Sequence, residues 1–155
     1  MFSRILVAYD DGNVAKKALD KAIDLAKDIG ADIYLISIYD RNNVQSWGLR
    51  GNRYPEDASK LFKPDNQDFY DAEAKYLEHF LREPADQVRK AGIAVHCHVT
   101  TGKPSAAIVE YARTKHIDLL VTGTHNRGPA AQFILGSVAN ELIHTAPCPV
   151  MVVRE

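Results

Sequence analysis

Short, almost uninterrupted apolar runs alternate along this chain with segments of helical spacing, and this alternation constrains the fold more than any other feature. The runs cover residues 5–9, 32–39, 93–99, 118–123 and 150–153. A strand forms a continuous apolar run when both of its faces are covered, as in a parallel sheet whose connections are helices. Strands that alternate with helices therefore predict an α/β fold with a parallel sheet.

Between the strands, apolar residues recur at intervals of three and four, which is the spacing of an amphipathic helix. These segments cover residues 14–29, 69–91, 104–112 and 138–143. Gly30 ends the first, Pro84 should kink or split the second, and Pro104 opens the third. We therefore expect an open five-stranded sheet in the order 3-2-1-4-5 with helices on both faces. Its ligand site should lie beyond the carboxyl ends of the strands, where the order reverses.

The chain has 155 residues, a length that suits one domain with a single core. We expect one domain over residues 1–155, interrupted by a long variable loop at about 40–66. Asparagine, glycine and proline punctuate this loop, and its isolated apolar residues include Trp47, Leu49 and Tyr54. Because long loops in compact domains are often functional lids, these residues either cover a ligand or belong to a disordered excursion.

Charge and composition exclude several classes of partner. The chain has 19 basic and 20 acidic residues and a formal net charge of -1, so no global field attracts nucleic acid or an anionic membrane. Every apolar run is far shorter than the roughly 18 residues that a membrane span needs. The N-terminus enters the first strand at once without a signal-like pattern, so we expect a cytoplasmic protein.

The cysteines and histidines give no metal-ligand pattern. Cys97 and Cys148 are too few and too far apart for a zinc ligand set, and their β-branched surroundings predict a structural role in the buried core. His96 and His98 share one face of the third strand, but no third ligand lies nearby in the sequence. We expect a partly exposed strand there rather than a metal site.

Two strand ends assemble the candidate site. Residues 8–10 close the first strand, and the segment 122–128 follows the fourth and leads to Gly136 and Ser137. Glycines let a backbone approach phosphate groups closely, and a helix that begins near Gly136 would direct N–H groups and a partial positive charge at them. Ser137 would donate its hydroxyl to a ligand; alternatively it only caps the helix, a role that needs no ligand.

At these residues the chain resembles the universal stress protein family. The segment 123–126, Gly-Thr-His-Asn, is followed after nine residues by Gly136-Ser137, which is similar to the family motif G-x2-G-x9-G-[ST]. The first strand and the tail at 146–153 are similar to that family as well, so the resemblance covers the chain outside the long loop. Within this motif one position departs, because Asn126 stands where the ATP-binding branch has its second glycine. Asparagine tolerates a positive φ and could keep the turn while adding an amide donor. A second departure is Asp-Gly-Asn at residues 11–13, where the family more often has Gly-Ser and an acidic residue.

The resemblance implies a Rossmann-like, adenine nucleotide alpha hydrolase-like fold and a contact set for ATP, ADP or AMP, with Mg²⁺ as an optional companion ion. Asp10 and the backbone of Ala8 and Tyr9 would contact the adenine. Ile38 would line the base pocket. The residues that would surround the ribose and the phosphates are Thr122, Gly123, Asn126, Arg127, Gly136, Ser137 and Val138.

Three functions remain open from the sequence. The first is a regulatory or stress-response module that binds an adenine nucleotide, the second is a nucleotide-free dimeric interaction protein, and the third is a slow ATP hydrolase. We predict no catalytic residue, because the sequence assigns His125 neither a nucleophile nor a carboxylate partner. Arg127 is either a phosphate contact or a solvated loop charge.

The last apolar run predicts a homodimer. Placed last in the order 3-2-1-4-5, this strand is an edge whose unpaired N–H and C=O groups invite pairing with another chain. It consists of Val150, Met151, Val152 and Val153, and charged residues follow only after it. Pairing with a second copy across a two-fold axis would close both edges at once. The alternative is a monomer whose own helices cover the edge.

Overall fold

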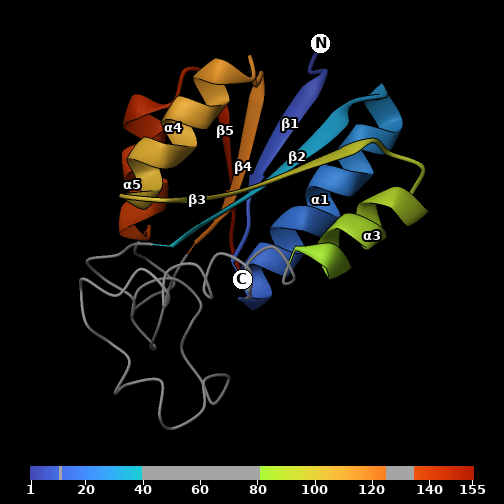
Figure 1. Ribbon diagram of the computed structural model, residues 1–155, viewed down its shortest axis with the longest axis horizontal. Helices are drawn as coiled ribbons and strands as arrows, with labels where there is room; N and C mark the ends of the chain where they lie inside the picture. Colours follow the sequence, from blue (N-terminus) through green and yellow to red (C-terminus); the bar gives the residue numbers. More distant parts are fainter. Residues whose placement is uncertain (11, 40–80, 125–134) are drawn as a thin grey trace, which may run out of the picture.

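Five parallel strands form the centre of the molecule, and helices cover both faces of the sheet (Figure 1). The computed structural model describes residues 1–10, 12–39, 81–124 and 135–155. The strands are β1 (Arg4–Ala8), β2 (Asp32–Tyr39), β3 (Val95–Thr101), β4 (Leu119–Gly123) and β5 (Val150–Val153). The helices in these ranges are α1 (Asn13–Ile29), α3 (Arg82–Lys90), α4 (Pro104–Thr114) and α5 (Ser137–Thr145).

The strand order is β3-β2-β1-β4-β5, which confirms the prediction from the sequence. β1 pairs in parallel with β2 on one side and with β4 on the other. From β1 the chain moves outward through β2 to β3, and it then returns to the opposite side of β1 with β4. The order therefore reverses between β1 and β4, and this is where ligands bind in open parallel sheets.

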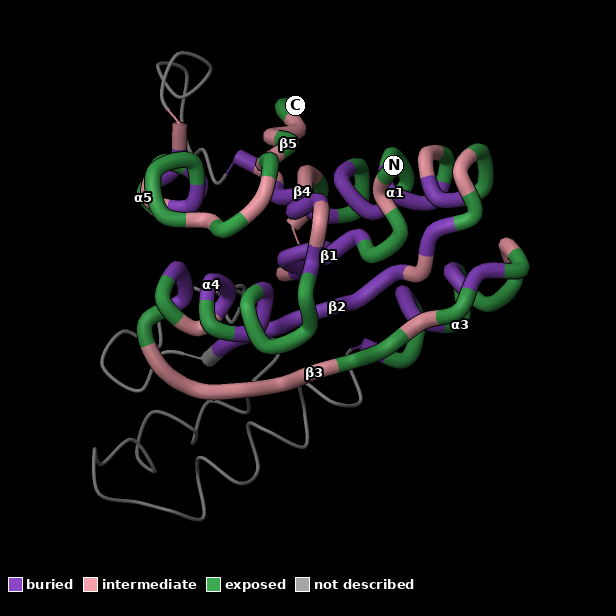
Figure 2. Tube along the Cα trace, turned by 90° about the horizontal axis from the view of Figure 1, so that it is seen from above, coloured by how far each residue is buried: buried purple, intermediate pink, exposed green. Residues whose placement is uncertain are grey.

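Each face of the sheet has its own apolar core. α1 and α3 cover one face, and α4 and α5 cover the other (Figure 2). β1 contributes to both cores, because Ile5 and Val7 pack on the α1 side while Leu6 and Ala8 pack on the α4 side. Complete burial of one large aliphatic side chain stabilises a fold by roughly 1.5–3 kcal/mol. The unbroken apolar run in the sequence thus reflects burial on both faces of β1.

The helix-ending and helix-starting signals are confirmed where the structure describes them. Gly30 follows α1 in the left-handed conformation, with φ 71°, and its N–H donates to the carbonyl of Ala26 at 2.9 Å. A residue with a side chain would be strained at this φ. Pro104 occupies the first turn of α4, where its missing N–H costs no hydrogen bond.

β3 begins and ends two residues later than the apolar run at 93–99 predicted. Ile93 belongs to the turn after α3, since its N–H donates to the carbonyl of Val88 at 3.3 Å. The ladder with β2 starts where Val95 pairs with Ile33, and it continues through the polar residue Thr101. Threonine is well suited to a half-exposed edge strand, so hydrophobicity alone placed this boundary wrongly.

The prediction that both cysteines lie in the core was wrong. Cys97 is exposed, because β3 is an edge strand and only β2 pairs with it in the described sheet. Cys148 is half-buried and packs against the core on the α4 side. A β-branched neighbourhood occurs in edge strands as well as central ones, so it did not distinguish these positions.

Part of the sequence prediction concerns residues that the structure does not describe. The long loop at about 40–66, with Trp47, Leu49 and Tyr54, lies outside the described ranges, as does the helical pattern before Leu81. That pattern continues as α3, with Pro84 in its first turn. Among the described helices, none has the length and apolar character needed to cross a bilayer.

Asp118 joins the starts of β1 and β4, at the end of the sheet opposite the predicted site. Its carboxylate accepts hydrogen bonds from the N–H of Ser3 at 2.8 Å, the hydroxyl of Ser3 at 2.9 Å and the N–H of Arg4 at 3.0 Å. Partial burial acts to raise the pKa of Asp118, but the hydrogen bonds from Ser3 and Arg4 outweigh it and hold the pKa below its usual value. The carboxylate therefore ties together the two strands that carry the site.

We expect Asp118→Asn to lower the free energy of unfolding by about 1–3 kcal/mol at neutral pH, because both carboxylate oxygens accept hydrogen bonds and an amide has only one acceptor oxygen, so its NH2 group would face a donor. A carboxyl with a depressed folded pKa contributes stability above its unfolded pKa and loses it as the pH falls through the folded pKa. Urea unfolding should therefore give a lower free energy of unfolding for Asp118→Asn than for the wild type at neutral pH. In acid the two free energies should become equal.

Asp24→Asn provides the control, because Asp24 is an exposed carboxylate on α1. It should change the free energy of unfolding by less than about 0.5 kcal/mol at any pH. Equal stability of wild type and Asp118→Asn at neutral pH would show that the carboxylate does not join the two strands.

Candidate functional site

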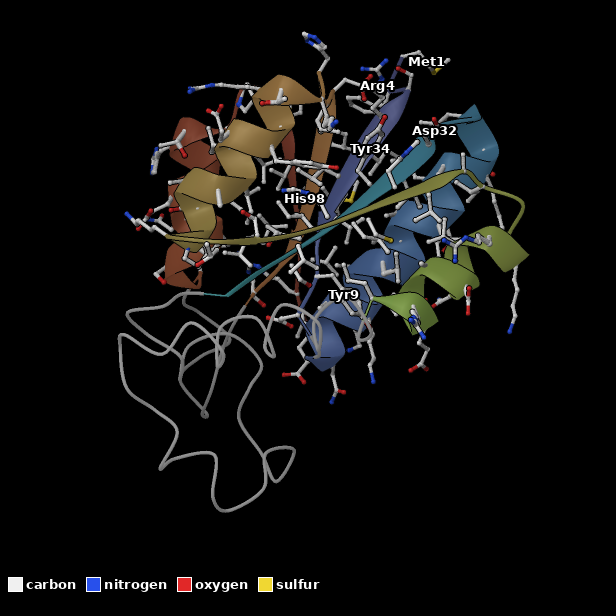
Figure 3. The ribbon with its side chains drawn as sticks, viewed as in Figure 1. Met1, Arg4, Tyr9, Asp32, Tyr34 and His98 are labelled. Carbon is white, nitrogen blue, oxygen red and sulfur yellow. The ribbon has the colours of Figure 1, made fainter. Side chains whose placement is uncertain are left out.

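The candidate site lies where β1 and β4 end side by side. Ala8 and Thr122 are direct partners in the ladder between these strands, and each is only 5% exposed. In Figure 3, Arg4 marks the start of β1, and Tyr9, which follows the last residue of β1, lies at the carboxyl end of the sheet. Beyond β4, the N–H of Thr124 donates to the carbonyl of Val153 at 2.9 Å, which ties this strand end to β5. The end of β1 and the described part of the second predicted segment, residues 122–124, are therefore adjacent.

Tyr9 holds the end of β1 in place. Its ring is buried in the core on the α1 side, and its N–H donates to the carbonyl of Ile36 at 2.9 Å. The hydroxyl of Ser37 donates to the carbonyl of Tyr9 at 2.5 Å. Ser37 is 2% exposed, and the sequence analysis did not select it. The sequence feature that could have identified Ser37 is a hydroxyl between two isoleucines in a strand that is buried on both faces. A buried hydroxyl requires a hydrogen-bond partner.

Asp10 forms the turn that leads from β1 into α1. Its Oδ1 accepts a hydrogen bond from the N–H of Gly12 at 2.8 Å, and Gly12 is the cap residue of α1. A Cβ at Gly12 would lie 2.9 Å from the same Oδ1, so the glycine allows the carboxylate to fold back over the turn. A negative charge at this position also interacts favourably with the positive end of the α1 dipole. Asp10 thus shapes the first strand end directly.

Gly123 lets the start of α1 approach the end of β4. A Cβ built on Gly123 would lie 2.9 Å from Cγ1 of Val14 and 3.2 Å from the backbone carbonyl carbon of Val14. Contacts of 2.9 Å are shorter than packed carbon atoms tolerate. The glycine at this motif position is therefore required by helix-to-strand packing, which brings α1 close to the junction of β1 and β4.

α5 begins at the same end of the sheet (Figure 1). Gly136 is its cap residue and Ser137 its first helical residue, so the alternative that Ser137 caps this helix was wrong. Within the described residues, no side chain caps α5, and the first intrahelical bond runs from the N–H of Asn140 to the carbonyl of Gly136 at 2.9 Å. The N–H groups before that of Asn140 cannot bond within the helix, because no helical carbonyl precedes them by four residues. These groups form the positive end of the α5 dipole.

The remaining predicted residues divide into two groups. Asn126 and Arg127 lie outside the described ranges, as does His125. Val138 is half-buried and packs on the α4-side core. Ile38 belongs to that core and is 2% exposed, so it has little surface to offer a base unless neighbouring residues move.

The two histidines of β3 stack on tyrosines. His96 lies over Tyr34 with ring centroids 4.4 Å apart, and His98 lies over Tyr111 at the same distance with nearly parallel rings. Tyr34 and His98 are labelled in Figure 3. Burial lowers the pKa of His98, and the nearby Lys115 ammonium lowers it further, so the neutral ring is favoured. In the part of the chain that the structure describes, no group of three His, Cys, Asp or Glu side chains could hold a metal ion.

Comparison with known proteins gives one consistent family. The model described as "Universal stress protein family" matches residues 1–154. Universal stress protein MJ0531 from Methanocaldococcus jannaschii is 30% identical over 155 residues, which cover 100% of this chain and 84% of that protein. The chain is therefore similar to this relative over its full length.

Solved structures share the architecture. Universal stress protein UspA from Lactobacillus plantarum superposes with a TM-score of 0.74 at 23% identity, covering 99% of this chain and 98% of its own. A universal stress protein in complex with cAMP gives a TM-score of 0.67 at 21% identity, over 99% and 97%. An Arabidopsis thaliana family member with AMP bound gives 0.61 at 17% identity, over 99% and 92%. At these identities the likeness establishes the fold.

The Gly123 packing generates a stability prediction. We expect Gly123→Ala to lower the free energy of unfolding by about 1–3 kcal/mol, because the new Cβ overpacks against Val14. Val14→Ala removes the nearest carbon atom, so the double variant should lose less stability than the sum of the two single losses. Chemical denaturation of the four proteins measures this coupling. Strictly additive losses would mean that Val14 does not impose the glycine.

Proposed function

Because this chain belongs to the universal stress protein family, we propose that it binds ATP or a related adenine nucleotide as a regulatory or stress-response module. The observation that carries the proposal is the junction of β1 and β4, where Ala8 and Thr122 end side by side at the switch point of the sheet. Family members in complex with cAMP and with AMP support an adenine nucleotide as the ligand class.

In this proposal the base lies at the β1 end of the site. Asp10 and the backbone of Ala8 and Tyr9 contact the adenine, and Ile38 lines the base pocket from β2. The Tyr9 N–H already donates to Ile36, so hydrogen bonding from this strand end to a base depends on other groups of the same segment. Asp10 is half-buried beside the start of α1 and supplies an acceptor there.

The ribose and phosphates lie toward β4 and α5. Gly123, next to Thr122, borders the ribose, and the N–H groups of the first turn of α5 bind phosphate oxygens. The residues assigned to the phosphates are Asn126, Arg127, Gly136, Ser137 and Val138.

The described residues fit an anionic ligand better than a resident metal ion. The exposed Ser137 and the first turn of α5, whose cap residue is a glycine, are suitable donors for phosphate oxygens. The described ranges contain no cluster of acidic or imidazole groups that could hold Mg²⁺. A Mg²⁺ ion would therefore enter with the nucleotide, bound mainly by phosphate oxygens and water, as this ion commonly is.

Titration calorimetry with ATP tests the phosphate end. We expect saturable binding to the wild type and loss of binding in Gly136→Leu, because a bulky side chain at the cap would occupy the approach to the α5 N–H groups. Ala94→Leu is the control, since Ala94 is exposed in the turn between α3 and β3, and it should bind ATP like the wild type. Both variants should unfold cooperatively.

Two outcomes would overturn parts of this assignment. Unchanged ATP affinity in Gly136→Leu would remove Gly136 from the site. A wild type that neither binds ATP nor carries nucleotide absorbance after purification would favour a nucleotide-free interaction protein. Phosphate release that survives stringent purification and disappears in Gly136→Leu would instead indicate a slow ATP hydrolase.

We also propose a homodimer formed through β5. β5 lies at an edge of the sheet, and its burial is incomplete: Met151 is 37% exposed, while Val150, Val152 and Val153 are half-buried. An apolar edge strand without charges is a template for pairing with another chain. An antiparallel contact across a two-fold axis would cover both edges and leave no further strand open.

Light scattering at micromolar concentration tests this interface. We expect a dimeric wild type and a monomeric Met151→Lys variant, because the substitution places like charges close to the axis. Ile143→Lys is the matched control: Ile143 is an exposed apolar residue of α5 rather than of β5, with 46% of its surface exposed, and this variant should remain dimeric. A monomeric wild type, or equal behaviour of the two lysine variants, would contradict a β5 interface.

A further inference from the structure

Three polar side chains join the start of α4 to α5. The Nζ of Lys103, the residue before α4, lies 2.9 Å from Oε2 of Glu141 on α5. The hydroxyl of Ser105 in the first turn of α4 donates to the same Oε2. Ser105 is 4% exposed, whereas Lys103 is largely exposed. The Glu141 carboxylate is therefore held by one buried hydroxyl and one solvent-facing cation.

The position of this carboxylate links it to the proposed phosphate site. Glu141 is one helical turn beyond Ser137. Helical side chains lean toward the N-terminus and cover the turn before their own Cα, so the carboxylate lies along the first turn of α5. α4 also begins at this end of the sheet (Figure 1). A negative charge thus lies about one helical turn from the N–H groups assigned above to phosphate.

The carboxylate stays ionised at neutral pH. The hydrogen bond from Ser105 and the ion pair with Lys103 hold the pKa of Glu141 below its usual value. An ionised carboxylate here repels an incoming phosphate, and the Lys103 ammonium opposes that repulsion by the same Coulomb law. The pair together is formally neutral, so its effect on an anion depends on both members being present.

We propose that Lys103 and Glu141 form a charge-compensating pair that sets how strongly the site distinguishes nucleotides by their number of phosphate groups, with Ser105 positioning the carboxylate. This inference rests on the proposed nucleotide-binding function. Removal of Lys103 leaves the carboxylate uncompensated and penalises ATP more than AMP. Removal of Glu141 leaves the ammonium uncompensated and favours ATP. Removal of both restores the wild-type preference.

Calorimetric titration of ATP, AMP and adenosine in EDTA tests the pair, since EDTA keeps the phosphates free of Mg²⁺. We expect Lys103→Met to lower the ratio of ATP to AMP affinity about two- to tenfold and Glu141→Gln to raise it by a similar factor. The double variant should return to the wild-type ratio. Adenosine affinity should stay constant, and added salt should reduce all differences.

Matched variants distinguish an effect of the Lys103 charge on nucleotide affinity from an effect on the folded structure. Lys103→Arg keeps the cation and should behave as the wild type. Lys27→Met removes an exposed lysine near the end of α1, far along the helix from its start at the site, and should leave the ratio unchanged. Cooperative unfolding by circular dichroism verifies that each variant is folded.

The outcomes distinguish this inference from the proposed function. A wild type that binds none of the three ligands would overturn both. Wild-type ATP binding with an unchanged ATP to AMP ratio in Lys103→Met would overturn the charge pair alone. An equal loss of affinity for ATP and for adenosine in Lys103→Met would also overturn the charge pair. Lys103 and Glu141 would then act only through the packing of α4 on α5.

Discussion

Burial of β1 on both faces is the constraint on which the rest of the structure depends. Ile5 and Val7 fill one core while Leu6 and Ala8 fill the other, so helices must cover both sides of the sheet. Connections that cover one face first and the other later force the strand order to reverse beside β1. The same packing requirement that stabilises the fold thus brings the carboxyl ends of β1 and β4 together.

Local contacts then shape that junction. Ser37 and Asp10 fix the backbone on the β1 side, and Gly123 brings the start of α1 against β4. Asp118 fastens the same two strands at their opposite ends. The site is therefore held by the most buried part of the sheet, whereas the groups proposed to bind phosphate belong to the start of a helix. This division suits the proposed binding module, because buried strands would position the base and the N–H groups of a helix start would face the phosphates.

Much of the fold could be predicted from the sequence, since continuous apolar runs specify strands covered on both faces and β2 and β5 begin and end as expected. The apolar pattern predicted the bounds of the edge strand β3 less well, because β3 is half-exposed and includes the threonines at its end. That the ends of β1 and β4 and the start of α5 lie at one end of the sheet could be predicted as well, while their role in binding stays a prediction. The roles of Ser37 and Glu141 could not be predicted, because they depend on contacts between segments far apart in the sequence.

The central claim is that an adenine nucleotide binds at the junction of β1, β4 and α5. Amide NMR spectroscopy during titration with ATP tests it most directly, because each backbone N–H reports its own surroundings. We predict saturable shifts at the amides of Asp10, Gly123 and Ser137, whereas those of Gly92 and Ala94, at the opposite end of the sheet, should not change. A spectrum that does not respond to ATP, or shifts confined to the turn between α3 and β3, would contradict it.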